Sequence, residues 1–122
     1  MLLVADCIFC KIIRGELPST KVFENEFVVA FRDIVPLAKI HIVIIPKKHI
    51  PTLNDFQAED WHYITEIHQA AQQIARDLGT AERGFRLVNN CNADGGQVVY
   101  HLHYHLLGGE KLALLSVNSE GV

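Results

Sequence analysis

The spacing of apolar residues along the chain predicts two helices, one short and one long. Residues 7–14 carry apolar side chains three and four positions apart, with Asp6 as the expected N-cap and Gly15 as the stop. From position 54 or 55 to Leu78 the apolar residues recur at the same helical steps, and Gly79 follows. The second helix is therefore expected to be the long one.

Five other segments have the composition or the alternation of β-strands. These strands are expected at 21–24, 27–33, 40–46, 84–90 and 98–107. The order helix, three strands, helix, two strands predicts an α+β fold with a mainly antiparallel five-stranded sheet, and with the helices packed on part of one face. The tail after Gly109 is expected to be irregular.

Length and charge narrow the function classes. The chain has 122 residues and 13.7 kDa, which fits one domain spanning 1–122. A net charge of -3 gives no general attraction to nucleic acid or to anionic lipid, so neither is an expected partner. Three cysteines, the lack of a signal-peptide pattern and the lack of an apolar run of about 20 residues lead us to expect a cytoplasmic protein.

The clearest alternation in the chain belongs to three histidines. A period of two places His101, His103 and His105 on one side of an extended segment, with same-side neighbours roughly 6.5 to 7 Å apart. The opposite side carries Leu102, Tyr104 and Leu106. Histidine is neither common nor strongly β-preferring, so a merely polar strand face is the weaker interpretation and a functional site the stronger one.

Two kinds of chemistry fit these histidines. His-x-His on a strand can chelate zinc, and a third histidine completes a catalytic site with an open water position. Alternatively, one neutral imidazole attacks phosphorus while its neighbours contact phosphate oxygens. The preceding turn, Asp94-Gly95-Gly96-Gln97, can present backbone N–H groups to an anion, which favours phosphate chemistry.

The segment around the histidines also resembles a known family. Residues 95–109, with Gly-Gly-Gln followed by His-x-His-x-His and apolar residues, look like the signature of the histidine triad (HIT) family, specifically its Hint branch of purine nucleoside phosphoramidases. Further segments in the family's order and spacing are Cys7–Ile13, Phe31–Ile34, His41–Ile50 and Gly84–Asn90. The fold implied is HIT-like.

This resemblance implies a nucleotide hydrolase that needs no cofactor for catalysis. The substrates would be AMP amidates and related acyl-AMP anhydrides, cleaved through a nucleotidyl-histidine. His103 would be the nucleophile, His105 and Gln97 would contact the phosphate oxygens, and His41 would support the network that His101 completes. The physiological leaving group and the choice between adenine and guanine are left open.

The resemblance also assigns a nucleotide pocket. Asp33 would bind the ribose hydroxyls, Asn90 would lie near the ribose and phosphate, and Val98 and Val99 would adjoin the phosphate. The base would be walled by Ile8, Phe9, Ile12, Phe31, Ile34 and Val43. Without the resemblance, these six apolar residues would be taken as core. Val98 stands where many eukaryotic Hint proteins carry a serine, so assistance to the leaving group is expected to be weaker.

Cys7 and Cys10 form a Cys-x-x-Cys, which is half of a common zinc site. Some bacterial relatives complete such a pair with two histidines, which here would be His49 and His101, and this would give a structural zinc that leaves His103 free. The alternative is that both cysteines are small buried apolar residues.

The family is commonly a homodimer, and we expect the same of this chain. Trp61, Tyr63 and Val88 are the candidate interface residues, while His62 and His68 are expected on a solvated or partner-facing surface. Two other functions are considered: a regulatory protein that binds AMP or GMP with incidental slow hydrolysis, and a zinc-dependent hydrolase with the triad as ligands.

Overall fold

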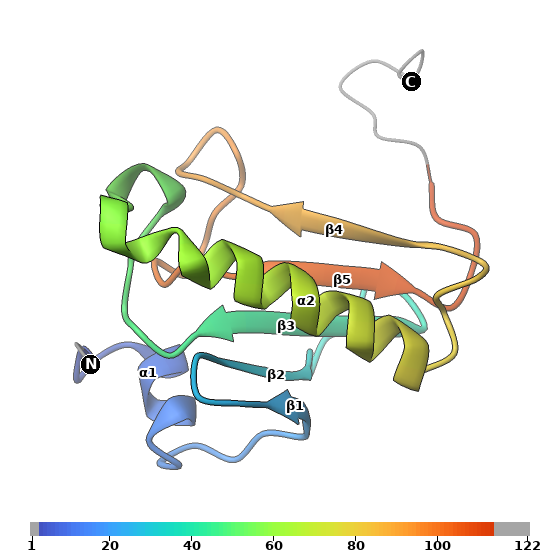
Figure 1. Cartoon of the computed structure of the whole chain (residues 1–122), viewed down its shortest axis with the longest axis horizontal. Coiled ribbons are helices and arrows are strands. Elements are labelled where there is room, and N and C mark those ends of the chain that lie inside the picture. The colour runs from blue at the N-terminus through green and yellow to red at the C-terminus, as the bar shows by residue number, and fades with distance from the viewer. Residues whose placement is uncertain (1–2, 114–122) are drawn as a thin grey trace.

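A five-stranded antiparallel sheet forms the centre of the computed structural model, which describes residues 3–113 (Figure 1). The strands are β1 (Lys21–Glu24), β2 (Val28–Arg32), β3 (Ile40–Pro46), β4 (Phe85–Asn89) and β5 (Tyr104–Gly108), in the order β1-β2-β3-β5-β4. The helices are α1 (Ile8–Ile13) and α2 (His62–Asp77), with short 3-10 turns η1 (Leu53–Asp55) and η2 (Ala58–Asp60) before α2. The predicted fold class is confirmed, and β5 lies inside the sheet between β3 and β4.

The two helices cover opposite faces of the sheet, whereas the sequence analysis placed both on one face. Ile42 and Ile44 of β3 pack in the core beneath α2, while Val43 and Ile45 pack with Phe9 of α1. A strand that is buried on both faces needs no polar side, which explains the continuous apolar runs of β2 and β3. The face beneath α1 is therefore available to build a site.

Both helices begin later than expected. The N-cap of α1 is Cys7 rather than Asp6, and the Cys7 sulfur accepts the backbone N–H of Cys10 at 3.4 Å. The long helix begins at His62, because the segment before it closes into the two 3-10 turns. A carboxylate closes each turn: the Asp55 side chain accepts the Thr52 N–H, and the Asp60 side chain accepts the Gln57 N–H.

The last predicted strand is also shorter than expected. It begins at Tyr104, not at position 98. Before Tyr104 the backbone makes other hydrogen bonds in place of those of a strand. The Leu102 N–H donates to the Ile50 carbonyl at 2.7 Å, and the Asn89 side-chain amide donates to the His103 carbonyl at 3.0 Å. His101 and His103 therefore lie on an extended approach to β5, and His105 lies within it.

The remaining boundaries differ little. β2 and β4 are each one residue shorter at both ends than predicted, and β1 and β3 have the predicted bounds. Residues 110–113 form no regular element, and the rest of the predicted irregular tail lies outside the described residues. Among residues 3–113 no helix has the length and apolar character needed to cross a membrane.

Candidate functional site

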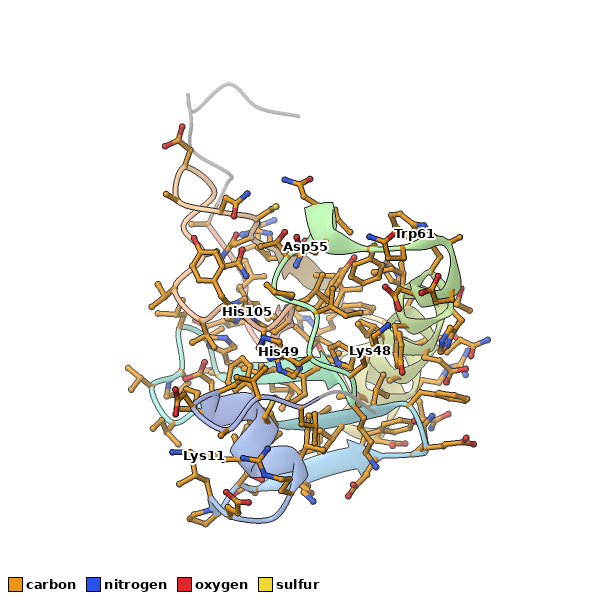
Figure 2. The ribbon with its side chains drawn as sticks, turned by 90° about the vertical axis from the view of Figure 1, so that its left-hand side faces the viewer. Lys11, Lys48, His49, Asp55, Trp61 and His105 are labelled. Atoms are coloured by element: carbon orange, nitrogen blue, oxygen red, sulfur yellow. The ribbon has the colours of Figure 1, made fainter. Side chains whose placement is uncertain are left out.

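The three triad histidines all face α1. The ring of Phe9 lies edge-on to His101 and His103, with centroids 5.8 Å and 5.1 Å away, and the His103 and His105 rings are 5.0 Å apart. On the other side of the segment, Leu102 is fully buried in the core beneath α2. The predicted alternation is therefore correct even where no strand forms. In Figure 2, His49 and His105 lie on the α1 side of the sheet, whereas Trp61 lies on the α2 side.

The position of the His103 ring fixes its tautomer. Its Nδ1 lies 2.8 Å from the His101 carbonyl oxygen. Because a carbonyl only accepts, Nδ1 carries the proton and Nε2 keeps a free lone pair. Burial lowers the pKa of His103, which keeps the ring neutral at pH 7. A buried, neutral imidazole with a held Nδ1–H is suited to act as a nucleophile through Nε2.

A second chain of hydrogen bonds fixes His41 and His105. The Leu37 N–H donates to His41 Nδ1 at 3.0 Å, so the proton of His41 is on Nε2. That nitrogen lies 2.8 Å from His105 Nδ1, which must accept, and the proton of His105 is then on Nε2. The site thus combines one imidazole with a free lone pair, His103, and one with a free N–H, His105.

The pKa values of this pair favour the neutral forms that the tautomers require. Burial lowers the pKa of His41 and outweighs the opposite effect of Asp33, whose carboxylate lies 3.4 Å from His41 Nε2. The pKa of His105 is lowered to about 4, mainly by burial and then by the neighbouring His103 and His41. Both rings are uncharged near neutral pH.

Two groups of residues in the described chain have the spacing of metal ligands, and only one fits a metal. Asp33, His41 and His105 bring their donor atoms within 4.8 Å of one another. However, His41 Nδ1 already accepts from Leu37, so His41 Nε2 holds a proton and has no lone pair for an ion. This group is a hydrogen-bonded network.

The other group, Cys7, Cys10, His49 and His101, does fit. His101 Nδ1 lies 3.4 Å from the Cys7 sulfur and 3.5 Å from the Cys10 sulfur, and His49 Nδ1 lies 3.4 Å from the Cys10 sulfur. Tetrahedral zinc with ordinary bond lengths separates sulfur and nitrogen ligands by about 3.5 Å. The spacing and the two-sulfur, two-nitrogen donor set therefore suit Zn²⁺.

Hydrogen bonds around this cluster orient its donor atoms. His101 Nε2 donates to the Pro46 carbonyl at 3.0 Å, which turns the Nδ1 lone pair toward the cysteines. Backbone N–H groups of Val4 and Cys10 donate to the sulfurs of Cys10 and Cys7, at 3.3 Å and 3.4 Å. Burial lowers the pKa of His101 to about 4, and it also lowers the pKa of His49 and raises that of Cys10. Both imidazoles are thus neutral at pH 7, which is the form that binds a metal.

The glycine-containing turn before the triad is held in one shape by Gln97. Its side-chain nitrogen donates to the carbonyls of Pro51 and Val99, and its oxygen accepts the Asn92 N–H. These bonds use the amide's donors within the protein, so the predicted phosphate contact requires one of them to be exchanged. A Cβ at Gly95 would lie 2.6 Å from the carbonyl oxygen of Cys91, a close approach that requires glycine.

The predicted base wall is only partly assembled. Phe9, Ile12, Phe31 and Val43 lie in one buried cluster, against which Val99 also packs. Ile8 is exposed, and Ile34 and Val98 are 95% and 86% exposed.

The two polar residues assigned to the nucleoside lie at strand ends. Asp33 directly follows β2, and its Oδ1 accepts the Val35 N–H while Oδ2 faces His41. Asn90 directly follows β4 and is partly buried.

Three functional contacts were not anticipated from the sequence. They are the Leu37 N–H on His41, the Pro46 carbonyl on His101 and the Asn89 amide on the His103 carbonyl. In the first two, the unanticipated partner is a backbone atom, which no residue type reveals. Only Asn89 carried a possible signal, as a polar residue at the end of an apolar strand.

The residues predicted for a dimer interface differ in exposure within the single chain. Trp61 is 51% exposed, and Val88 lies on β4, at an edge of the sheet. Tyr63 is only 8% exposed within the single chain, where its ring packs near Phe27. His62 and His68 are exposed on α2, as expected.

Comparisons with known proteins agree with this geometry. The model of the HIT domain family matches residues 14–112. The purine nucleoside phosphoramidase of Escherichia coli K12 is 50% identical over 107 residues, which cover 88% of this chain and 90% of that protein.

Two solved structures are similar over nearly their whole length. A histidine triad protein from Clostridium difficile has a TM-score of 0.91 and 47% identity, and the match covers 94% of this chain and all of that one. A HIT family hydrolase from Legionella pneumophila has a TM-score of 0.84 and 51% identity, covering 87% and 95% of the two chains.

Proposed function

Because the chain belongs to the HIT domain family, we propose that it hydrolyses purine nucleoside 5′-phosphoramidates through a covalent nucleotide on His103. The observation that carries this proposal is the pair of fixed tautomers, with a free lone pair on His103 and a free N–H on His105. The phosphoramidase activity named for the E. coli relative, and the hydrolase named for the L. pneumophila structure, support the same class of reaction.

The reaction has two steps. His103 Nε2 attacks the α-phosphorus, a P–N bond to the ring forms, and the P–N bond to the amine breaks as the amine takes up a proton from solvent. Water then attacks the phosphorus, gives up a proton to solvent and breaks the bond to His103, which releases AMP. The N–H on His105 Nε2 donates to a phosphate oxygen, where negative charge develops in both steps.

The nucleoside is placed by groups beside the reacting ring. The carboxylate of Asp33 accepts the ribose hydroxyls, and the buried apolar cluster of α1, β2 and β3 contacts the base. Asn90 and the backbone at Val98 and Val99 contact the ribose and phosphate. The side chain of Val98 cannot donate a hydrogen bond, so any help to the leaving group comes from elsewhere.

The test is AMP release from adenosine 5′-phosphoramidate by the chelated, full-length protein. We expect turnover, and a rapid alkaline denaturing quench, in which the acid-labile P–N bond to histidine survives, should trap protein heavier by one AMP group. AMP binding without turnover would contradict the proposal and favour a nucleotide-binding regulatory role. Turnover restored only by added zinc would favour a metal-dependent hydrolase instead.

We also propose that Cys7, Cys10, His49 and His101 hold a structural zinc. The sulfur–nitrogen spacing and the orientation of His101 by Pro46 support this assignment. Bound zinc would supply a cross-link between α1 and the sheet and would not contact the reacting atoms.

Metal content tests the zinc proposal. Protein purified without chelator is expected to contain one zinc per chain, and Cys10→Ser is expected to lose most of it because a thiolate ligand is replaced by a weaker one. Cys91→Ser is the matched control, since Cys91 is a free thiol outside the cluster. Equal zinc content in Cys10→Ser and Cys91→Ser would rule out the assignment.

We further propose that the chain forms a homodimer in the cytoplasm. The edge strand β4 and the exposed Trp61 are surfaces open to a second copy.

A further inference from the structure

We propose that Phe9 is a positioning residue that couples the metal cluster to His103, so that metal occupancy sets the orientation of the reacting imidazole. The inference rests on the proposed role of His103 as nucleophile. It assigns to the cluster an effect on catalysis that is separate from its effect on stability.

The first connection between the two sites is a backbone bond. His101 contributes its ring to the metal cluster through Nδ1, and its own carbonyl oxygen accepts the His103 Nδ1–H at 2.8 Å. A movement of His101 toward or away from the cysteines therefore moves the acceptor that fixes the His103 tautomer. The free lone pair on His103 Nε2 depends on that acceptor.

The second connection is the Phe9 side chain. Phe9 lies between Cys7 and Cys10 in the Cys-x-x-Cys, so its backbone belongs to the first turn of α1, which an ion held by both cysteines would clamp. Its buried ring meets His103 edge-on at 5.1 Å and His101 at 5.8 Å. One ring thus contacts both a metal ligand and the reacting imidazole.

The Phe9 ring already packs edge-on to Phe31 of β2 at 5.7 Å, in the buried cluster with Val43 and Ile45. Helix α1 itself has only six residues, which is too short for its own hydrogen bonds to make it stable. Its buried side chains, Phe9, Cys10 and Ile12, provide the packing. An ion bound to Cys7 and Cys10 would tie the segment on both sides of Phe9 to His49 and His101. The Phe9 ring, fixed in this way, would restrict rotation of the His103 ring.

The experiment combines imidazole NMR with kinetics on the folded, full-length protein. With Zn²⁺ bound, ¹⁵N–¹H spectra are expected to show a sharp Nδ1–H signal for His103, and after chelation that signal is expected to broaden. Phe9→Leu keeps a large apolar side chain and all four ligands, so it should still bind one zinc. Its His103 signal should broaden nevertheless, and kcat for AMP release should fall on the order of tenfold. Cys91→Ser should match the wild type in both readouts.

The outcomes separate positioning from simple base contact. A rise in KM with unchanged kcat and an unchanged His103 signal in Phe9→Leu would mean that Phe9 only lines the base pocket, and would overturn the inference. The coupling is also refuted if chelated and zinc-loaded wild type share one signal and one kcat. If the chelated protein unfolds, the inference is decided by the His103 signal and kcat of the zinc-loaded Phe9→Leu variant alone. Full turnover by His103→Ala would instead overturn the proposed function.

Discussion

Replacing His103 with alanine is expected to lower kcat/KM for adenosine 5′-phosphoramidate on the order of a thousandfold or more. The variant has no atom that can take the place of Nε2 in the covalent step. Its affinity for AMP should change little, because Asp33 and the apolar cluster beneath α1 remain in place. Steady-state AMP release and equilibrium binding of AMP measure the two effects separately.

The matched control is His62→Ala, which removes an exposed imidazole on α2, the helix on the opposite face of the sheet. It should retain wild-type turnover. A His103→Ala protein that remains folded and hydrolyses the substrate at the wild-type rate would exclude His103 as the nucleophile. If the variant loses both AMP binding and turnover, His103 acts mainly in binding the nucleotide.

The sequence was sufficient to predict which side of the triad segment forms the site. A period of two depends only on an extended backbone, so it holds at His101 and His103, where no ladder exists. The start of the strand was not predictable, because Asn89 and the Ile50 carbonyl, both distant in the sequence, take the place of the ladder partners.

The prediction of a sheet covered on one face was wrong, although the sequence held the signal that corrects it. Both β2 and β3 are apolar at successive positions, which is the pattern of strands covered on two faces. The six residues of α1 gave too weak a signal to be placed against one of those faces. Its placement determines the site, since α1 brings Phe9 to His103.

The chemistry of the site was only partly accessible from residue types. The alternation singled out three histidines, and the family resemblance supplied His41 and His49. Which ring nitrogen carries each proton could not be predicted, because Leu37 N–H and the His101 carbonyl decide it. The imidazoles proposed as nucleophile and donor differ here in the group that each Nδ1 faces, which is the His101 carbonyl for His103 and the His41 ring for His105.

Lowering the pH from about 6.5 to about 4 is expected to destabilise the folded protein through the His41–His105 pair. Burial holds the pKa of His105 at about 4, below its ordinary value of 6.5. The groups that face it are His103 and His41, which lower the pKa further, and Asp33, which raises it. Between pH 6.5 and pH 4 the unfolded chain binds the proton and the folded chain does not. The contribution of this pair to the free energy of unfolding therefore falls as the pH falls through this window, and it is constant above pH 6.5.

Such a shift corresponds to about 3 kcal/mol for a fully buried group, and to about 2 kcal/mol here because His105 is partly exposed. Urea unfolding of chelated protein at pH 7 and pH 4.5 measures the loss. His105→Asn is the comparison, since asparagine does not titrate. The two proteins should differ in how much the free energy of unfolding changes between pH 7 and pH 4.5, and this difference reports the coupled pair. Equal pH dependence in the two proteins would mean that folding does not lower the pKa of His105. The hydrogen bond from His41 Nε2 to His105 Nδ1 would then not hold His105 neutral as the pH falls, and the tautomer chain from Leu37 through His41 would lose its support.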